Sequence, residues 1–144
     1  MSQFTYPAKI KKDAAGFFLV TFPDIPFAAT DGKTMAEALE EARDCLEEAI
    51  AVSIADNLDF PFPSSIGKRQ HAIPLTARMS AKAALYIAVS ETGISKSELA
   101  RRLGVDEKEI RRMLSPKQQT KLPRIERALS VLGYHLSVSL QKAA

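Results

Sequence analysis

The sequence contains one cysteine, Cys45, and so it cannot form a disulfide within the chain. It also has no run of about 18 apolar residues, the length that a membrane-spanning helix requires. Its first residues, MSQFTYPAKIKK, lack the apolar core of a signal peptide. Structural disulfides are features of oxidising compartments, so these absences together predict a cytoplasmic protein without membrane attachment.

Histidine is also scarce, with only His71 and His135 in the chain. Each flanks a predicted strand, and neither has a second ligand at a spacing typical of a metal site. We therefore expect structural histidines, no metal site and no cofactor. Cys45 lies in a helical pattern without a nearby base, which indicates a packing residue rather than a nucleophile.

Charge is distributed unevenly along the 144 residues. Residues 1–70 contain seven Lys or Arg against eleven Asp or Glu, a net charge of −4, whereas residues 71–144 contain thirteen against six, a net charge of +7. A change of sign along a chain indicates two modules with different partners. The basic half suits phosphate, and the acidic half suits a basic protein.

The acidic half predicts a small antiparallel sheet covered by one helix. Strands are expected over residues 4–13 and 16–22, with a short third strand near residues 27–30, because apolar residues alternate and turn residues separate the runs. Thr34 and Glu37 form a capping-box pattern at the start of a helix of about twenty residues. Its apolar stripe contains Met35, Leu39, Ala42, Leu46, Ala49, Ile50, Ser53 and Ile54.

The pattern predicts three parts in the chain: a first domain over residues 1–63, a linker over 64–72 and a second domain over 73–144. The predicted linker overlaps the run FPFPSSIG, residues 60–67, in which prolines, serines and a glycine interrupt the helical and strand patterns. The second domain is predicted to contain four helices and a terminal strand, YHLSVSL, and so the fold class is α+β. HAIPL before the first of these helices is a further short strand.

The stretch SKSELARRLGVDEKEIRRML, residues 95–114, predicts a helix-turn-helix. Ser95 and Asp106 are expected to cap its two helices, and Gly104 to relax the turn between them. The apolar positions expected to pack the two helices together are Leu99, Ala100, Leu103, Val105, Ile110 and Leu114. The second helix of such a unit enters the major groove, where arginine pairs with guanine. The candidate DNA-binding residues, with Gln119 beside them, are Lys96, Arg101, Glu107, Lys108, Arg111, Arg112, Lys117, Gln118, Thr120 and Lys121.

The chain resembles a HicB-type antitoxin of a type II toxin–antitoxin pair. The resemblance is carried by YPAKI, FPDIPFAATDGKTMAEALEEARDCLEEAI and FPFPSS in the first half. In the second half it is carried by the run from IPLTARM to IRRML and by PRIERALSVLGYHLSVSL. One departure is Phe27, where the family often has glycine after PDIP.

This resemblance implies a partial RNase H-like domain that binds and blocks a HicA-like toxin, a small protein that cleaves messenger RNA. It also implies a C-terminal domain that represses the protein's own operon by binding operator DNA. The residues proposed to contact the toxin are in the PDIPF turn and on the acidic helix face: Asp24, Ile25, Phe27, Glu40, Asp44 and Glu47. No converging carboxylate cluster of the kind that two-metal hydrolysis needs is visible, so we expect no enzymatic activity.

The terminal strand is predicted to join two copies of the chain, because a lone strand at a chain end must pair or expose an apolar edge. A homo-oligomer follows, a dimer or a tetramer, and its dimerisation residues are Tyr134, Leu136, Val138 and Leu140. Two other functions stay open at this point. One is a stand-alone helix-turn-helix repressor whose N-terminal domain senses a small ligand, and the other is a nuclease.

Overall fold

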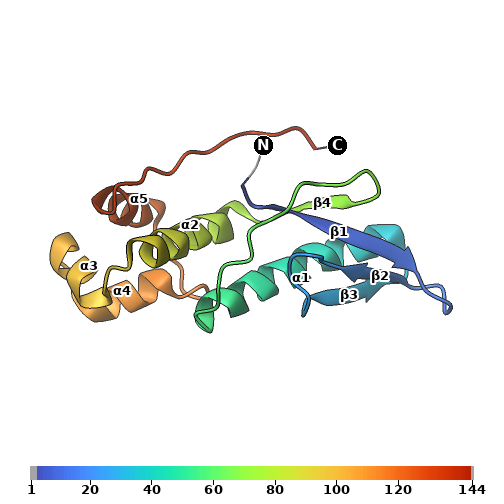
Figure 1. Cartoon of the computed structure of the whole chain (residues 1–144), viewed down its shortest axis with the longest axis horizontal. Helices are drawn as coiled ribbons and strands as arrows, with labels where there is room; N and C mark the ends of the chain where they lie inside the picture. The colour runs from blue at the N-terminus through green and yellow to red at the C-terminus, as the bar shows by residue number, and fades with distance from the viewer. Residues whose placement is uncertain (1–2, 144) are drawn as a thin grey trace. The chain divides into compact units, whose positions relative to one another are not determined.

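The computed structural model describes residues 3–143 and divides the chain into two compact units, Met1–Met79 (unit 1) and Ser80–Ala144 (unit 2) (Figure 1). The fold is α+β, as predicted. The strands are β1 (Thr5–Lys12), β2 (Phe18–Thr21), β3 (Ala29–Gly32) and β4 (His71–Pro74). The helices are α1 (Met35–Ala55), α2 (Ala77–Thr92), α3 (Lys96–Leu103), α4 (Glu107–Leu114) and α5 (Leu122–Val131).

Unit 1 contains a four-stranded sheet in the order β3-β2-β1-β4, in which all neighbours are antiparallel. The central strand β1 pairs Ile10 with Val20 of β2 and Tyr6 with Ile73 of β4. Tyr6, Val20 and Ile73 are all at most 1% exposed. The sheet therefore depends on a strand that follows β1 by about sixty residues in the sequence.

Helix α1 packs on this sheet, mainly against β3. The predicted helix cap at Thr34 is confirmed, since the Glu37 N–H donates to the Thr34 hydroxyl at 3.1 Å, but the reciprocal bond of the capping box is shifted by one residue. The Glu37 carboxylate in turn accepts from the N–H of Lys33, also at 3.1 Å. Most of the predicted apolar stripe is buried, but Met35 is 37% exposed and Ala38 is buried in its place.

The predicted boundary between the domains is corrected by strand β4. Because His71–Pro74 pairs with β1, the segment before it is not a free linker, and residues 73–79 belong to unit 1 rather than to the second domain. Ser64 is also fixed in unit 1 by hydrogen bonds from its N–H and hydroxyl to the Asp24 carboxylate. Counted at the observed boundary, unit 1 has eight Lys or Arg against eleven Asp or Glu, and unit 2 has twelve against six.

Unit 2 is built from α3, α4, α5 and all but the first turn of α2 around one apolar core. The buried members of this core are Ala81, Leu85, Ala88, Leu99, Ala100, Leu103, Ile110, Met113, Ile125, Ala128 and Leu129. Pro123 lies in the first turn of α5, where a residue without an N–H leaves no helical hydrogen bond unmade. None of the helices among the described residues is long and apolar enough to span a lipid bilayer.

The predicted terminal strand over residues 134–140 is wrong for the single chain. This segment pairs with no strand among residues 3–143, and it runs irregularly after α5 (Figure 1). Leu136 packs partly against the core of unit 2, whereas Val138 and Leu140 are 85% and 100% exposed. The physical reason is that a strand needs a hydrogen-bonded neighbour, and the other strand predicted in this half, β4, is part of the sheet of unit 1.

Candidate functional site

Helices α3 and α4 are joined by a tight turn whose geometry follows from three residues. The Ser95 hydroxyl accepts from the Glu98 N–H at 3.1 Å, and the Asp106 carboxylate accepts from the Glu109 N–H at 2.9 Å. Gly104 ends α3 with φ +67°, a left-handed conformation that favours glycine. All three assignments made from the sequence are confirmed, and they set the direction in which α4 leaves the turn.

Packing between α3 and α4 uses the apolar positions that the sequence predicts. Leu99, Ala100 and Leu103 of α3 and Ile110 of α4 are all at most 5% exposed in the core of unit 2. Met113 of α4 is also buried there, although the sequence analysis did not select it. With this side of α4 turned inward, its charged residues occupy the opposite, exposed side.

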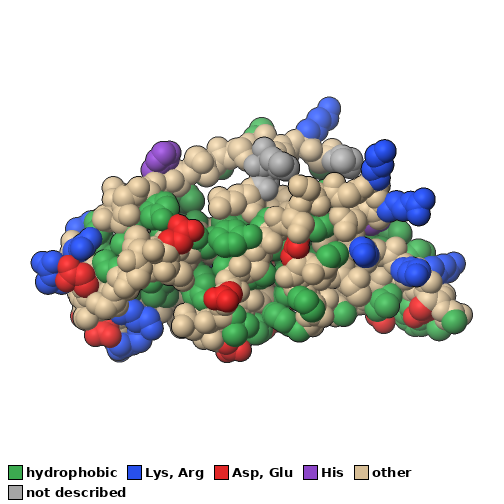
Figure 2. Space-filling view, in the orientation of Figure 1, with side chains coloured by type: hydrophobic (Ala, Val, Ile, Leu, Met, Phe, Trp, Pro, Cys, Tyr) green, Lys and Arg blue, Asp and Glu red, His purple; other side chains and the backbone are tan. Residues whose placement is uncertain are grey.

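Cationic side chains gather where α3 and α4 form one end of unit 2, with acidic side chains between them (Figure 2). Lys96, Lys108 and Arg112 are exposed. Arg111 is 56% exposed and contacts Glu107 at 3.4 Å, one turn earlier on α4. Four of the predicted DNA-contacting cations therefore lie on the accessible surface of the α3–α4 pair.

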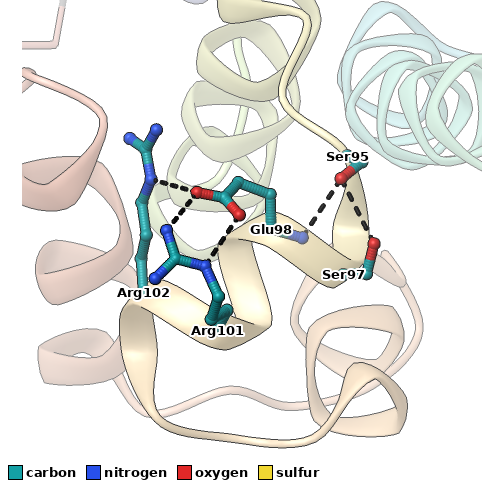
Figure 3. A network of polar contacts seen from close by, with 5 residues as sticks. All are labelled: Ser95, Ser97, Glu98, Arg101 and Arg102. Carbon is teal, nitrogen blue, oxygen red and sulfur yellow. Dashed lines mark hydrogen bonds and ion pairs between the residues drawn. The ribbon is translucent and has the colours of Figure 1, made fainter.

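Glu98 of α3 holds two arginines at once (Figure 3). Its carboxylate contacts Arg101 at 2.6 Å and Arg102 at 3.0 Å. Hydrogen bonds from Arg101 and then Arg102 lower the pKa of Glu98 to about 2. Arg101, a predicted phosphate contact, is therefore oriented by an acidic neighbour while its side chain stays 71% exposed.

The loop between α4 and α5 carries the remaining predicted contacts, and they do not share one environment. Lys117, Gln118 and Lys121 are exposed. The Thr120 hydroxyl is half-buried and accepts a hydrogen bond from Lys82 of α2 at 2.7 Å. The structure thus assigns Thr120 an internal partner that the sequence did not indicate.

Five cations of unit 2 were not selected from the sequence, and three of them, Arg102, Arg124 and Lys82, contact other described residues of the unit. Arg102 lies beside Arg101 on α3, and Arg124 of α5 forms an ion pair with Glu109 of α4. Lys82 is buried under the end of α4. The available signal was a single lysine within the small and apolar run SAKAALYIAV of α2.

The residues predicted to contact a toxin fall into two groups. Phe27 is 58% exposed, and Glu40 and Asp44 are exposed on α1. The side chains of the other three are engaged within unit 1. Ile25 is 1% exposed, Asp24 accepts from Ser64, and Glu47 accepts from the Thr76 N–H at 3.1 Å. Buried Ile25 thus has no surface to offer a partner, which corrects its assignment as a contact.

An aromatic group in unit 1 was missed. Phe4, Phe60 and Phe62 stack edge to face, with ring centroids 6.1 Å and 5.1 Å apart along the series. Phe62 is 50% exposed and lies within the proline-rich run FPFPSSIG, just before the predicted linker. The Asp24–Ser64 hydrogen bonds bring the PDIPF turn and the end of this run together, forty residues apart in the sequence.

The described residues contain no group of three or more His, Cys, Asp and Glu side chains that could hold a metal ion. His71 lies in β4, and His135 is exposed after α5. Burial, and then the nearby Glu41, raise the pKa of the Cys45 thiol. A raised pKa disfavours the thiolate form that a nucleophilic cysteine requires.

Comparison with known proteins yields a family model and several curated relatives. Residues 5–84 match a model described as "HicB_like antitoxin of bacterial toxin-antitoxin system". The chain is 40% identical over 133 residues to "Antitoxin HicB 2" of Photorhabdus laumondii, covering 92% of this chain and 94% of that protein. It is 35% identical over 133 residues to "Antitoxin HicB" of Escherichia coli K12, covering 92% and 96%. "Antitoxin HicB" of Pseudomonas fluorescens is 31% identical over 141 residues, covering 97% and 96%.

Proposed function

Because the chain belongs to the HicB family of antitoxins from toxin–antitoxin systems, we propose that it neutralises a HicA-like, messenger-RNA-cleaving toxin through unit 1 and represses its own operon through unit 2. The observation that carries the second activity is the α3–α4 pair. It has capped ends, a left-handed glycine in the turn and exposed arginines on the second helix.

We assign α3 and α4 to a helix-turn-helix with α4 as the recognition helix. Such a helix inserts its N-terminal half into the major groove, and the first helix crosses the phosphate backbone. Lys108, Arg111 and Arg112 of α4 are the base-reading candidates, because arginine forms bidentate contacts with guanine. Lys96 and Arg101 of α3 and Lys117 and Lys121 of the following loop are the phosphate contacts.

Replacing one residue of each class tests this division. Arg111→Ala is expected to cost roughly 1–3 kcal/mol on the duplex upstream of the chain's own gene and to relax one base position. Lys117→Ala is expected to weaken binding to that duplex and to random DNA alike, and to reduce the salt slope by about one unit. Fluorescence anisotropy across a potassium chloride series measures both quantities. Equal losses on the two duplexes for Arg111→Ala would move Arg111 to the phosphate class.

Unit 1, a partial RNase H-like domain in this proposal, is the toxin-binding part. A toxin that binds RNA must carry positive charge, so an acidic cover gains both steering and complementarity. Exposed Glu40 and Asp44 on α1 supply that charge, although exposed Arg43 lies between them in sequence. Phe27 supplies an exposed aromatic side chain of the kind enriched at the centres of interfaces.

Charge reversal tests the acidic surface in growing cells. The chain carrying both Glu40→Lys and Asp44→Lys is expected to lose rescue of growth when its toxin is induced. A chain with Glu126→Lys, also an exposed acid but on α5 of unit 2, serves as a control and is expected to rescue. If the double variant is folded and soluble and rescues as well as the control, α1 is not the contact surface.

For the oligomer, we propose that residues 134–140 pair with the same segment of a second copy. The segment follows α5 without regular secondary structure, alternates apolar residues and leaves Val138 and Leu140 exposed in the single chain. Two joined copies would present two recognition helices at a fixed spacing, as a two-fold operator requires.

A further inference from the structure

Lys82 is a charged side chain buried inside unit 2. It lies in α2 and is only 2% exposed. Its Nζ donates to the carbonyl oxygens of Met113 at 2.8 Å and Arg112 at 3.3 Å, in the last turn of α4. It also donates to the Thr120 hydroxyl at 2.7 Å. One buried ammonium group therefore connects α2 to the end of α4 and to the loop between α4 and α5.

The end of α4 explains what this ammonium does locally. The last carbonyl groups of a helix have no partner within the helix, and they carry the negative end of its dipole. The next residue, Ser115, caps α4 through its backbone N–H alone, which contacts Arg111 and Arg112 carbonyls at 3.0 and 3.2 Å. Lys82 reaches the Met113 carbonyl, and the three hydrogens of an ammonium group allow it to donate to more than one acceptor at once.

We propose that Lys82 is a positioning residue for DNA recognition, which fixes the base-reading helix and the phosphate-contacting loop in one register. This inference rests on the proposed operator binding by unit 2. Of the two exposed arginines of α4, Arg112 itself carries one of the anchored carbonyls, and Arg111 directly precedes it. Lys117 and Lys121 lie on the loop that Lys82 holds through Thr120. Since both segments bond to the same nitrogen, removing it loosens one relative to the other.

Lys82 itself cannot contact DNA, because it is buried. Thr120 carries no charge, and the slope of binding against salt counts the cations that neutralise phosphates. A change of salt slope in a variant of either residue therefore reports displaced lysines elsewhere in the loop. Lower stability without displacement would reduce the fraction of folded protein and leave the slope and the preference for operator DNA unchanged.

The test uses the full chain with Lys82→Met and Thr120→Val, singly and together, at a temperature where each is folded. The probes are the duplex upstream of the chain's own gene and a random duplex of equal length, titrated across a potassium chloride series. Lys33→Met in unit 1 is the matched control for loss of one lysine, and it is exposed. If Lys82→Met does not fold, Thr120→Val alone decides, since it removes one acceptor at a half-buried loop position.

We expect each single variant to bind the operator duplex about tenfold more weakly, with a salt slope smaller by about one unit. The double variant is expected to lose no more than the worse single variant, because both changes break the same bond. Variants that keep the slope and the operator preference of the wild type would overturn the inference. A wild-type chain that binds neither duplex would instead overturn the proposed function, and the inference with it.

Discussion

Gly32, the last residue of β3, lies so close to the first turn of α1 that the structure leaves no room for a Cβ atom. A Cβ atom added there would lie 2.4 Å from the backbone nitrogen of Ala38, 2.7 Å from its Cα and 2.9 Å from the carbonyl carbon of Glu37. These atoms belong to the first turn of α1, which the Thr34 cap holds in place. Ordinary contacts of a Cβ atom begin near 3.4 Å, so Gly32→Ala requires α1 to move away from β3.

The cost follows from what must move. Overpacking a well-packed region typically lowers the free energy of unfolding by roughly 1–3 kcal/mol. Because the atoms in the way are backbone atoms of a capped helix, which cannot shift as a flexible side chain can, we expect Gly32→Ala to cost about 3 kcal/mol. Each kcal/mol lowers the melting temperature of a domain of 60–100 residues by roughly 4–8 °C. We therefore expect the unit 1 transition of Gly32→Ala to fall by about 12 °C or more.

Gly67→Ala provides the matched control within the same unit. The atoms nearest to its Cβ atom would belong to the side chain of Gln70, at 3.0 Å from Oε1, and a flexible side-chain end can shift. This variant is expected to stay within about 0.5 kcal/mol of wild type. Circular dichroism melts of both variants measure the difference. A Gly32→Ala protein that melts within 2–3 °C of the control, roughly the effect of 0.5 kcal/mol, would refute this account of β3 and α1.

Three further predictions concern the boundary of unit 1, the ion pairs of α3 and the terminal segment. A fragment of residues 1–79 is expected to unfold cooperatively, whereas residues 1–66 lack β4 and are expected not to, so equal melting curves would contradict the pairing with β1. Glu98 is expected to titrate near pH 2 rather than at its ordinary 4.5. The ion pairs of Glu98 therefore contribute fully to the free energy of unfolding above about pH 4.5, and this contribution is lost as the pH falls through 2. A pKa of 4 or more for Glu98, measured by NMR, would disprove this. The chain with Leu136→Lys and Val138→Lys is expected to have the monomer mass by light scattering, and an unchanged oligomer mass with unchanged operator affinity would exclude the terminal segment as the dimer element.

Local signals in the sequence predicted the local structure well. The caps at Thr34, Ser95 and Asp106 and the turn at Gly104 are decided by residues within four positions, and the structure has them where the pattern indicates. The apolar spacing also identified most of the α3–α4 packing. The α+β class followed from these elements.

Features that depend on distant partners were missed or misplaced. The pairing of β4 with β1 moved the boundary of unit 1, because pairing is not visible in the alternation of a single strand. The same limitation explains why the strand predicted at residues 134–140 is wrong for the single chain. Alternation predicts which side chains would share a side of the strand, but it does not identify a strand to pair with. Asp24 meets Ser64 forty positions later, and buried Lys82 meets Met113 thirty-one positions later. A lysine in an apolar helix pattern has no evident role in the sequence, because the carbonyl groups that accept its hydrogen bonds are far away along the chain.

We propose that this chain binds and inhibits a toxin, and co-purification followed by an RNA-cleavage assay tests this most directly. The tagged full chain is expressed from its own locus together with the neighbouring genes, and any bound protein is released and assayed for cleavage of messenger RNA. We expect a small basic protein encoded beside the chain's gene to co-purify with the chain and to cleave RNA once it is released. This cleavage is expected to stop when the full chain is added back in equimolar amount. Cleavage that continues unchanged in an excess of folded chain would contradict it.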